Sequence, residues 1–203
     1  MFSNTNLIAV FLCAALGACA NSGGSGSDLS ERIEQDGYSF IPPKQSGWFI
    51  ASRSSSRIAL AKSGKIDGQS YLIEGLHVSL STLTDLTQLR QFVAKINKRE
   101  VPAPRFRIRE HEISDTRIAG AHCVLTHLVA EDRQPETGGN VVTAMIVESV
   151  STVCAHPTSA ELGIRMTFLH RSFPEDRDRA FETYAQGVLL TQQFSPINKQ
   201  FAN

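Results

Sequence analysis

The sequence predicts an α+β fold in which two helices cover a mainly antiparallel β-sheet of about six or seven strands. Many short segments alternate between apolar and polar side chains with a period of two residues, as strands do. Two other segments repeat their apolar side chains every three or four residues, as amphipathic helices do. The segment 141–153 is apolar on both of its faces, so both faces need a cover. We therefore expect an α/β/α sandwich-like domain, with one helix on each face or both helices on one.

Alternating side chains divide the body of the chain into candidate strands. Pro42 and Pro43 separate the first two runs, because proline cannot donate to a β-ladder. Gly64 and Gly68 indicate a turn after the third run. The predicted strands are 38–41, 48–52, 57–62, 71–81, 105–113, 121–131, 140–156 and 162–171.

Two amphipathic segments are the candidate helices. The first begins near Asp85, a residue type that caps helices, and ends before Pro102. Its apolar stripe consists of Leu86, Leu89, Phe92, Val93 and Ile96. The second begins at Pro174, which suits the first turn of a helix, and ends before Pro196. Its apolar side chains are Phe181, Tyr184, Val188 and Leu189.

The composition of the chain excludes several classes of protein. Lys plus Arg number 20 and Asp plus Glu number 20, so the formal net charge is zero. A dedicated nucleic-acid-binding protein normally has a basic excess, so we expect no nucleic-acid partner. Apolar residues make up 41% of the chain, too many for a wholly disordered protein. Its longest apolar run falls short of the 18 or so residues that an ordinary transmembrane helix needs.

The first nineteen residues have the pattern of an export signal. Residues 7–18 read LIAVFLCAALGA, an apolar run that suits the centre of a secretory signal and is too short to cross a bilayer. Leu16-Gly17-Ala18-Cys19 resembles the lipobox of bacterial lipoproteins, in which small residues precede an obligatory cysteine. The resemblance implies that residues 1–18 are removed as a signal peptide and that Cys19 becomes the lipidated N-terminus. The alternatives are a plain signal peptide cleaved nearby and a short buried helix.

The resemblance also implies a location and a tether. In Gram-negative lipoproteins an Asp after the lipidated cysteine favours the inner membrane, whereas here Ala20 favours the outer membrane. Several acyl chains on one cysteine give a stable anchor, since each buried CH₂ contributes roughly 0.8 kcal/mol. Residues 19–35 contain a Gly/Ser-rich stretch that is typical of a flexible linker. We therefore expect a single domain, residues 36–203, held off the periplasmic face of the membrane.

Four cysteines suggest one disulfide. Cys13 is removed with the signal and Cys19 carries the lipid, which leaves Cys123 and Cys154 in an oxidising compartment. If Gly138 and Gly139 form a two-residue turn, these cysteines are directly opposite each other on neighbouring strands. In that strict register they occupy a hydrogen-bonded site, where the Cα atoms are wider apart, so a looser loop or a bulge would be needed. The alternative is a pair of buried thiols.

No catalytic or metal-binding motif is present. The chain has no Gly-x-Ser-x-Gly, no His-Glu-x-x-His and no Cys-x-x-Cys, and its six histidines lack the spacing of zinc ligands. Cys154 and His156 form a weak candidate pair for nucleophilic chemistry, but a disulfide explains the cysteine more simply. We therefore expect no metal and no cofactor, and an enzyme is less favoured than a binding protein.

An arginine row is the best candidate for a contact surface. We expect Arg105, Arg107, Arg109 and His111 to share one face of the predicted strand 105–113. Arginine forks bind carboxylates and phosphates with two hydrogen bonds, so the row suits an envelope protein or an anionic envelope polymer. The simpler alternative is a charged, solvated edge strand, which would also account for Glu110 and Glu112.

The order of elements, three strands, a helix, further strands and a second helix, resembles the PsbP-like α/β/α sandwich over most of residues 36–194. Because members of that fold are mostly non-enzymatic, the resemblance implies a binding or assembly role. We therefore expect an envelope-anchored lipoprotein that binds or supports a partner in the periplasm. The alternatives are an envelope hydrolase whose site assembles only in the fold, and a protein inhibitor that uses the loop 132–139.

Overall fold

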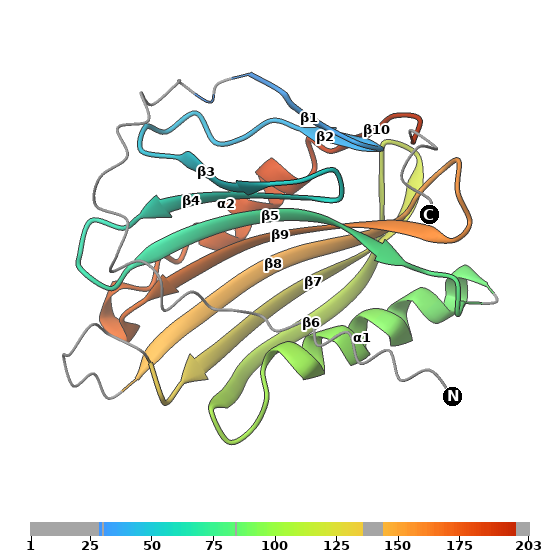
Figure 1. Ribbon diagram of the computed structural model, residues 1–203. Helices are drawn as coiled ribbons and strands as arrows, with labels where there is room; N and C mark the ends of the chain where they lie inside the picture. The colour runs from blue at the N-terminus through green and yellow to red at the C-terminus, as the bar shows by residue number, and fades with distance from the viewer. Residues whose placement is uncertain (1–28, 30, 84, 136–143, 198–203) are drawn as a thin grey trace, which may run out of the picture.

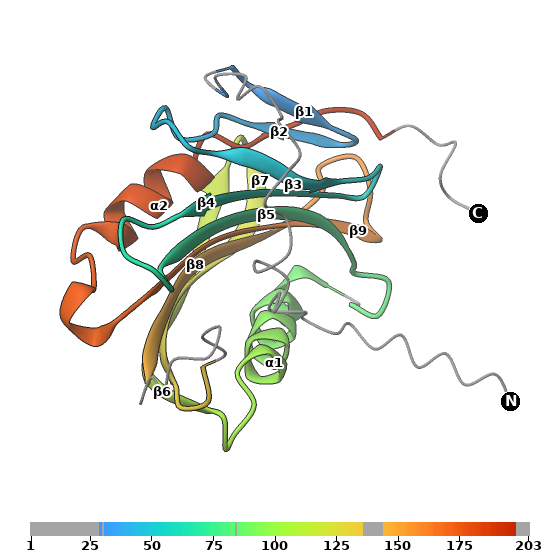
Figure 2. The same cartoon turned by 60° about the vertical axis from the view of Figure 1, so that its left-hand side comes forward.

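A curved antiparallel sheet with a helix on each face forms the body of the protein (Figures 1 and 2). The computed structural model describes residues 29–197 apart from residues 30, 84 and 136–143. Seven strands form the main sheet, and three further strands form a second, smaller one. The predicted α+β class is therefore confirmed. None of the helices in the described part of the chain is long and apolar enough to span a bilayer.

The main sheet has the strand order β3-β4-β5-β9-β8-β7-β6, and every neighbouring pair is antiparallel. Its strands are β3 (Phe49–Arg53), β4 (Arg57–Ser63), β5 (Ser70–Ser79), β6 (Phe106–Ile118), β7 (Ala121–Asp132), β8 (Met145–Ala155) and β9 (Leu162–Ser172). Long hairpins connect β6 to β7, β7 to β8 and β8 to β9, so four consecutive strands build one side of the sheet. β6 is the outermost strand on that side.

The second sheet was not expected from the sequence. It has the order β1-β2-β10, with β1 (Ile33–Gln35), β2 (Tyr38–Phe40) and β10 (Gln193–Phe194). It packs closely on the main sheet, because a Cβ atom at Gly75 would lie 2.6 Å from Tyr38 Oη. β1 falls within the range 19–35 that the sequence assigns to the tether, and Ile33 is buried in the core.

The first helix follows its predicted limits closely. A 3₁₀ turn, η1 (Leu86–Gln88), leads into α1 (Leu89–Glu100). Asp85 Oδ1 accepts a hydrogen bond from the Thr87 backbone N–H at 2.7 Å, which satisfies one of the free donors at the start of this segment. The apolar stripe of α1 packs against the β7–β8 part of the sheet. Leu89 and Val93 of the helix form one buried cluster there with Leu80, Val124 and Val153.

The second helix begins later than predicted. Pro174 starts only a 3₁₀ turn, η2 (Pro174–Asp176), and α2 spans Phe181–Leu189. The backbone leaves helical geometry at Arg177, whose ψ is 120°, so the expected continuous helix is interrupted there. Asp178 then accepts a hydrogen bond from the Ala180 backbone N–H at 2.9 Å and starts α2. At the same residue the Arg177 side chain bonds to distant strands, as described below, and these contacts have no signal in the local sequence pattern.

The two helices cover opposite faces of the sheet, as the apolar pattern of 141–153 requires (Figure 2). On the α2 face, Phe168 lies at the centre of an aromatic cluster. Its ring makes edge contacts with Trp48 at 5.6 Å and with Phe181 at 5.2 Å between centroids. Such pairs add roughly 0.5–1.5 kcal/mol each beyond the burial of their area. This packing makes α2 part of the core of the domain.

A tight turn sets the register of the β6–β7 hairpin. Ala119 and Gly120 connect the paired residues Ile118 and Ala121, and both have positive φ, 46° and 82°. Two consecutive positive φ values are typical of a type I′ turn, which suits a two-residue hairpin. Starting from the pair Ile118–Ala121, hydrogen-bonded and non-hydrogen-bonded pairs alternate along the β6–β7 ladder. This alternation determines which kind of pair Cys123 forms with its partner on β8, the strand on the other side of β7.

Candidate functional site

The predicted disulfide joins β7 to β8. Cys123 and Cys154 are cross-strand partners in the predicted register, with Cα atoms 4.0 Å apart, and both are fully buried. Counting from the tight turn, Cys123 forms a hydrogen-bonded pair with Thr116 of β6, so its pair with Cys154 is of the non-hydrogen-bonded kind. The close Cα atoms agree with this. The strict turn expected at Gly138 and Gly139 lies outside the described residues.

The arginine row lies on β6, the exposed edge of the main sheet. Arg107 pairs with Glu131 and Ile108 with Ala130, but the register shifts by one residue before Glu110 pairs with Val129. Arg109 is the extra residue of this β-bulge. A bulge bends the strand and reverses the alternation of side chains beyond it.

The bulge corrects one prediction about the row. His127 contacts Glu182 of α2, and Val129 and Glu131 lie on the same face of β7 as His127. Their cross-strand partners on β6, Glu110 and Arg107, therefore lie on the α2 face as well. His111 is the partner of Leu128 and points to the opposite face, where its Nε2 lies 3.3 Å from Asn97 Nδ2 of α1. The prediction that His111 belongs to the arginine face is wrong, because the extra residue moves His111 to the other side of the sheet.

Arg105 forms an ion pair with a buried carboxylate at the end of β7. It donates to both carboxylate oxygens of Asp132, from Nε at 3.0 Å and from Nη2 at 2.9 Å. Asp132 is fully buried, and the Arg105 guanidinium also lies 5.2 Å from the centre of the Phe106 ring. Because a buried carboxylate needs a partner, this arginine is held in the structure.

Arg109 and a residue that the sequence analysis missed, Arg133, share one carboxylate. Arg109 Nη2 donates to Glu131 Oε2, and Arg133 Nε lies 3.7 Å from Glu131 Oε1. The hydrogen bond from Arg109 lowers the pKa of Glu131 despite some burial, and the charges of Arg109, Arg133 and Arg107 lower it further. The Glu131 side chain is 16% exposed, whereas those of Arg109 and Arg133 are 45% and 47% exposed. The carboxylate is therefore recessed, and the guanidinium groups face outward.

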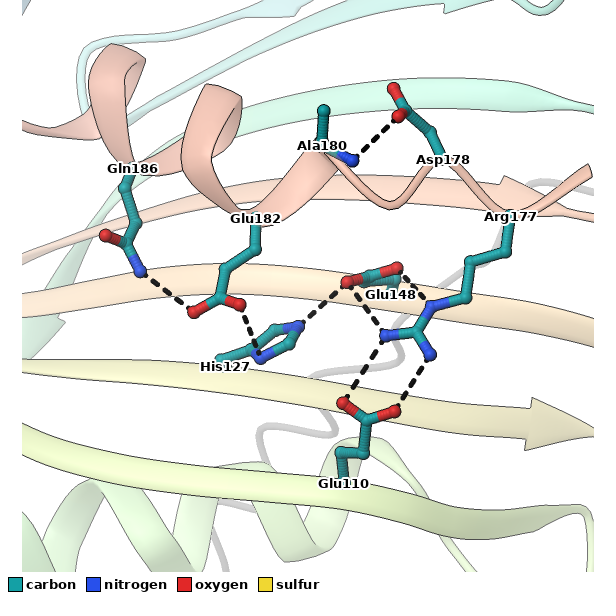
Figure 3. A network of polar contacts seen from close by, with 8 residues as sticks. All are labelled: Glu110, His127, Glu148, Arg177, Asp178, Ala180, Glu182 and Gln186. Carbon is teal, nitrogen blue, oxygen red and sulfur yellow. Dashed lines mark hydrogen bonds and ion pairs between the residues drawn. The ribbon is translucent and has the colours of Figure 1, made fainter.

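A second polar cluster, which we call the clasp, fastens α2 to the sheet (Figure 3). It consists of Glu110 of β6, His127 of β7, Glu148 of β8, Arg177 before α2 and Glu182 of α2. The chain thus contributes one side chain from each of three neighbouring strands and two from the α2 region. The sequence analysis named Glu110 only as part of a solvated edge, and the other four residues were missed.

Arg177 and His127 connect the carboxylates of the clasp. Arg177 Nε donates to Glu148 Oε2 at 2.8 Å, and its Nη1 donates to Glu110 Oε1 at 2.8 Å. His127 Nε2 lies 2.9 Å from Glu148 Oε1, and its Nδ1 lies 3.4 Å from Glu182 Oε2. The two cations thus bridge α2 and the preceding turn to the strands underneath.

The clasp shifts the titration of its members. The hydrogen bond with Glu148 raises the pKa of His127, burial opposes this, and the charges of Glu182, Glu148 and Glu110 add to the rise. Burial alone would raise the pKa of Glu148, but hydrogen bonds from His127 and Arg177 outweigh it and lower that pKa. Both shifts favour the charged forms, so the contacts of His127 in the clasp are ion pairs whenever its imidazole is protonated.

This arrangement is better suited to holding α2 than to catalysis. A general base needs a ring nitrogen that is free to take a proton, but each nitrogen of His127 faces a carboxylate. Two open hollows, of about 410 and 450 Å³, lie elsewhere, beside Arg53 and beside His156. Neither hollow is lined by His127 or Glu148.

Two further histidines, His156 and His170, have structural contacts of their own away from the clasp. His156 Nε2 lies 3.0 Å from the Gly37 carbonyl oxygen and 3.1 Å from that of Ser195, so it joins the second sheet to the main one. His170 is buried and stacks on Tyr71 at 4.2 Å, and burial lowers its pKa. Across residues 29–197, where the structure describes them, no three His, Cys, Asp or Glu side chains form a group that could hold a metal ion.

Comparisons with known proteins found no relative from which a function could be transferred. No model of a known protein family matches the sequence, and no curated protein is significantly similar to it. Cys19 and the signal segment 1–18 lie outside the described residues, as does the second half of the loop 132–139, residues 136–139.

Proposed function

We propose that this chain is a lipid-anchored envelope protein that binds an acidic partner without acting on it chemically. The proposed anchor is Cys19, in the context Leu16-Gly17-Ala18-Cys19, and the proposed location is the periplasmic face of the outer membrane. The buried Cys123–Cys154 disulfide fits an oxidising compartment outside the cytoplasm. The order of elements that resembles the PsbP-like sandwich also supports a binding or assembly role.

One observation supports the binding role most directly: the outermost strand presents outward-facing arginines whose carboxylate partners are recessed. Arg107, Arg109 and Arg133 are exposed whereas Glu131 is partly buried, so the positive side chains are the more accessible part of this edge to a partner. Charge arranged in this way favours encounter with an acidic surface and specifies the partner more than it strengthens binding. The anionic partner is an envelope protein or an envelope polymer.

The shape of the edge also argues against simple pairing with a foreign strand. Arg90 of α1 donates from Nη2 to the backbone carbonyl oxygen of Ile113 at 2.6 Å and forms an ion pair with Asp115 at 3.3 Å. A side chain on that carbonyl, together with the bulge at Arg109, blocks the extension of the sheet by another chain. Recognition through side chains is therefore the favoured use of this edge.

The test is capture of crosslinked partners from an envelope extract by the lipidated protein. Arg107→Ser combined with Arg109→Ser should reduce capture at least fivefold. Arg57→Ser is the matched control, because Arg57 of β4 is also exposed and paired with one carboxylate, Glu74. Arg105 is left intact, because it is the partner of the buried Asp132. Capture that is equal in wild type and double variant would contradict the proposal.

A further inference from the structure

Glu131 and its three arginines have the geometry of an anion-binding site. Arg109 and Arg133 contact the two different oxygens of Glu131, so both guanidinium groups gather at one carboxylate. Arg107 is the cross-strand partner of Glu131, and its charge also acts on that carboxylate. We call Arg107, Arg109, Glu131 and Arg133 the arginine clip.

The clip leaves most of its donors available. A guanidinium has five N–H donors. In the part of the chain that the structure describes, Glu131 is the only acceptor that Arg109 contacts, and it does so through Nη2. Arg133 approaches the same carboxylate through Nε. Among the described residues the remaining guanidinium N–H groups of these two arginines have no acceptor, and both side chains are nearly half exposed, so these donors are available to a ligand.

The charge of the clip selects the ligand. Three guanidiniums and one carboxylate carry a net charge of +2. A carboxylate ligand carries one negative charge and a phosphodiester also carries one, whereas a phosphomonoester carries about 1.5 to 2 near pH 7. Phosphate oxygens match the fork of arginine and accept two parallel hydrogen bonds. The best match in charge and in geometry is thus a phosphomonoester.

We propose that the arginine clip binds a phosphomonoester group on the envelope partner of this protein. The inference rests on the proposed binding role, and it names the chemical group that the β6 edge recognises. Glu131 acts in it as a positioning residue, since its carboxylate contacts Arg109 through one oxygen and Arg133 through the other.

The experiment uses the mature chain with Cys19→Ser and vesicles of neutral lipid that contain either phosphatidic acid or phosphatidylglycerol at matched surface charge. Phosphatidic acid presents a phosphomonoester and phosphatidylglycerol a phosphodiester. At pH 7.5 the protein should bind the first vesicle at least tenfold more tightly. Inorganic phosphate added to the same mixture should compete, whereas acetate at equal ionic strength should not. If competition fails, the contact is to the lipid surface and the phosphomonoester proposal is wrong.

Three variants separate an organised site from general charge. Arg109→Ser with Arg133→Ser should remove the tenfold preference, and Arg57→Ser should leave it within twofold of wild type. Glu131→Gln raises the local charge but frees the two arginines, so the preference for phosphatidic acid should fall toward unity. A stronger or unchanged preference in Glu131→Gln would show that only charge matters and would overturn the proposal. Equal thermal unfolding of the variants confirms that each is folded.

The outcome also distinguishes this inference from the proposed function. If the preference is absent while capture from the envelope extract still depends on Arg107 and Arg109, the phosphomonoester assignment fails and the binding role stands. If neither effect is seen, both are wrong. A preference that weakens severalfold between pH 7.5 and pH 5 would support the dianion as the ligand, because the second phosphate proton binds with a pKa of about 6. A preference unchanged over that range would contradict it.

Discussion

Removal of the cross-strand disulfide is the prediction whose size follows most directly from the structure. The perturbation is Cys123→Ala combined with Cys154→Ala. The bond closes a loop with a sequence separation of 31. In the chain-entropy treatment, that loop restricts the unfolded chain by about 12 cal/mol/K, which is about 3.7 kcal/mol at 25 °C. We expect the free energy of unfolding to fall by about that amount.

The assay is equilibrium unfolding in urea of the mature chain with Cys19→Ser. With a urea dependence of about 2 kcal/mol per molar, the midpoint should move down by roughly 1.8 M. Reduced wild type is the control and should unfold close to the double variant, because both lack the same constraint. A shift below about 0.5 M, or unlike behaviour of the reduced wild type, would refute the reasoning.

Three further predictions concern the anchor, the clasp and the edge. Radiolabelled palmitate should enter wild type and not Cys19→Ser, and equal labelling would show that the lipobox assignment is wrong. Contact with Glu148 raises the pKa of His127, so the folded chain holds that proton more tightly than the unfolded chain does. The stabilisation by His127 should therefore be complete below pH 6.5 or so and be lost as the pH rises through the raised pKa. Urea unfolding of wild type and His127→Gln from pH 5 to pH 9 should show the difference between them shrinking with rising pH, and a growing difference would contradict this sign. Arg105→Ser should lower the free energy of unfolding by about 3 kcal/mol, because it leaves the buried Asp132 without its cation and with only the hydrogen bond from the Gln134 backbone N–H; a change below about 1 kcal/mol would show that Arg105 is not structural.

Much of the fold follows from local patterns. The alternation in 121–131 and 162–171 predicted long strands, and β7 and β9 differ from these ranges by no more than a residue at either end. The two apolar faces of 141–153 predicted a cover on each side, which α1 and α2 provide. These features are set by side chains within one segment, so the sequence alone carries them.

The small sheet could not be predicted in this way. β1 and β10 contain only three and two residues, too few for a period of two to be recognised. The pairing of β10 with β2 also joins the end of the domain to its start, and such a long-range contact leaves no mark in a local window. The late start of α2 also coincides with long-range contacts, because the backbone of Arg177 is extended and its side chain bonds to Glu110 and Glu148 on distant strands.

The candidate site was predicted only in part. The sequence located the arginine edge through its alternation, but the bulge at Arg109 moved His111 to the other face. One signal was overlooked: Ala119-Gly120, between two strands, indicates a hairpin turn whose register determines the kind of pair that Cys123 forms with Cys154. Arg133 and the clasp come from residues far apart in the chain, so only the fold brings them together.

Photo-crosslinking in living cells tests the central claim, that the β6 edge contacts a partner, most directly. A photoreactive amino acid at Ile108, which is 46% exposed and lies between Arg107 and Arg109 in the chain but on the opposite face of the edge strand, should give a crosslinked species upon irradiation if a partner contacts this edge. The same amino acid at Leu190, which is 53% exposed at the end of α2, is the control for general accessibility. Our account predicts a crosslinked species from position 108 that disappears when Arg107 and Arg109 are replaced by Ser, and none from position 190. Crosslinking only from position 190, or crosslinking from position 108 that does not depend on the arginines, would contradict it.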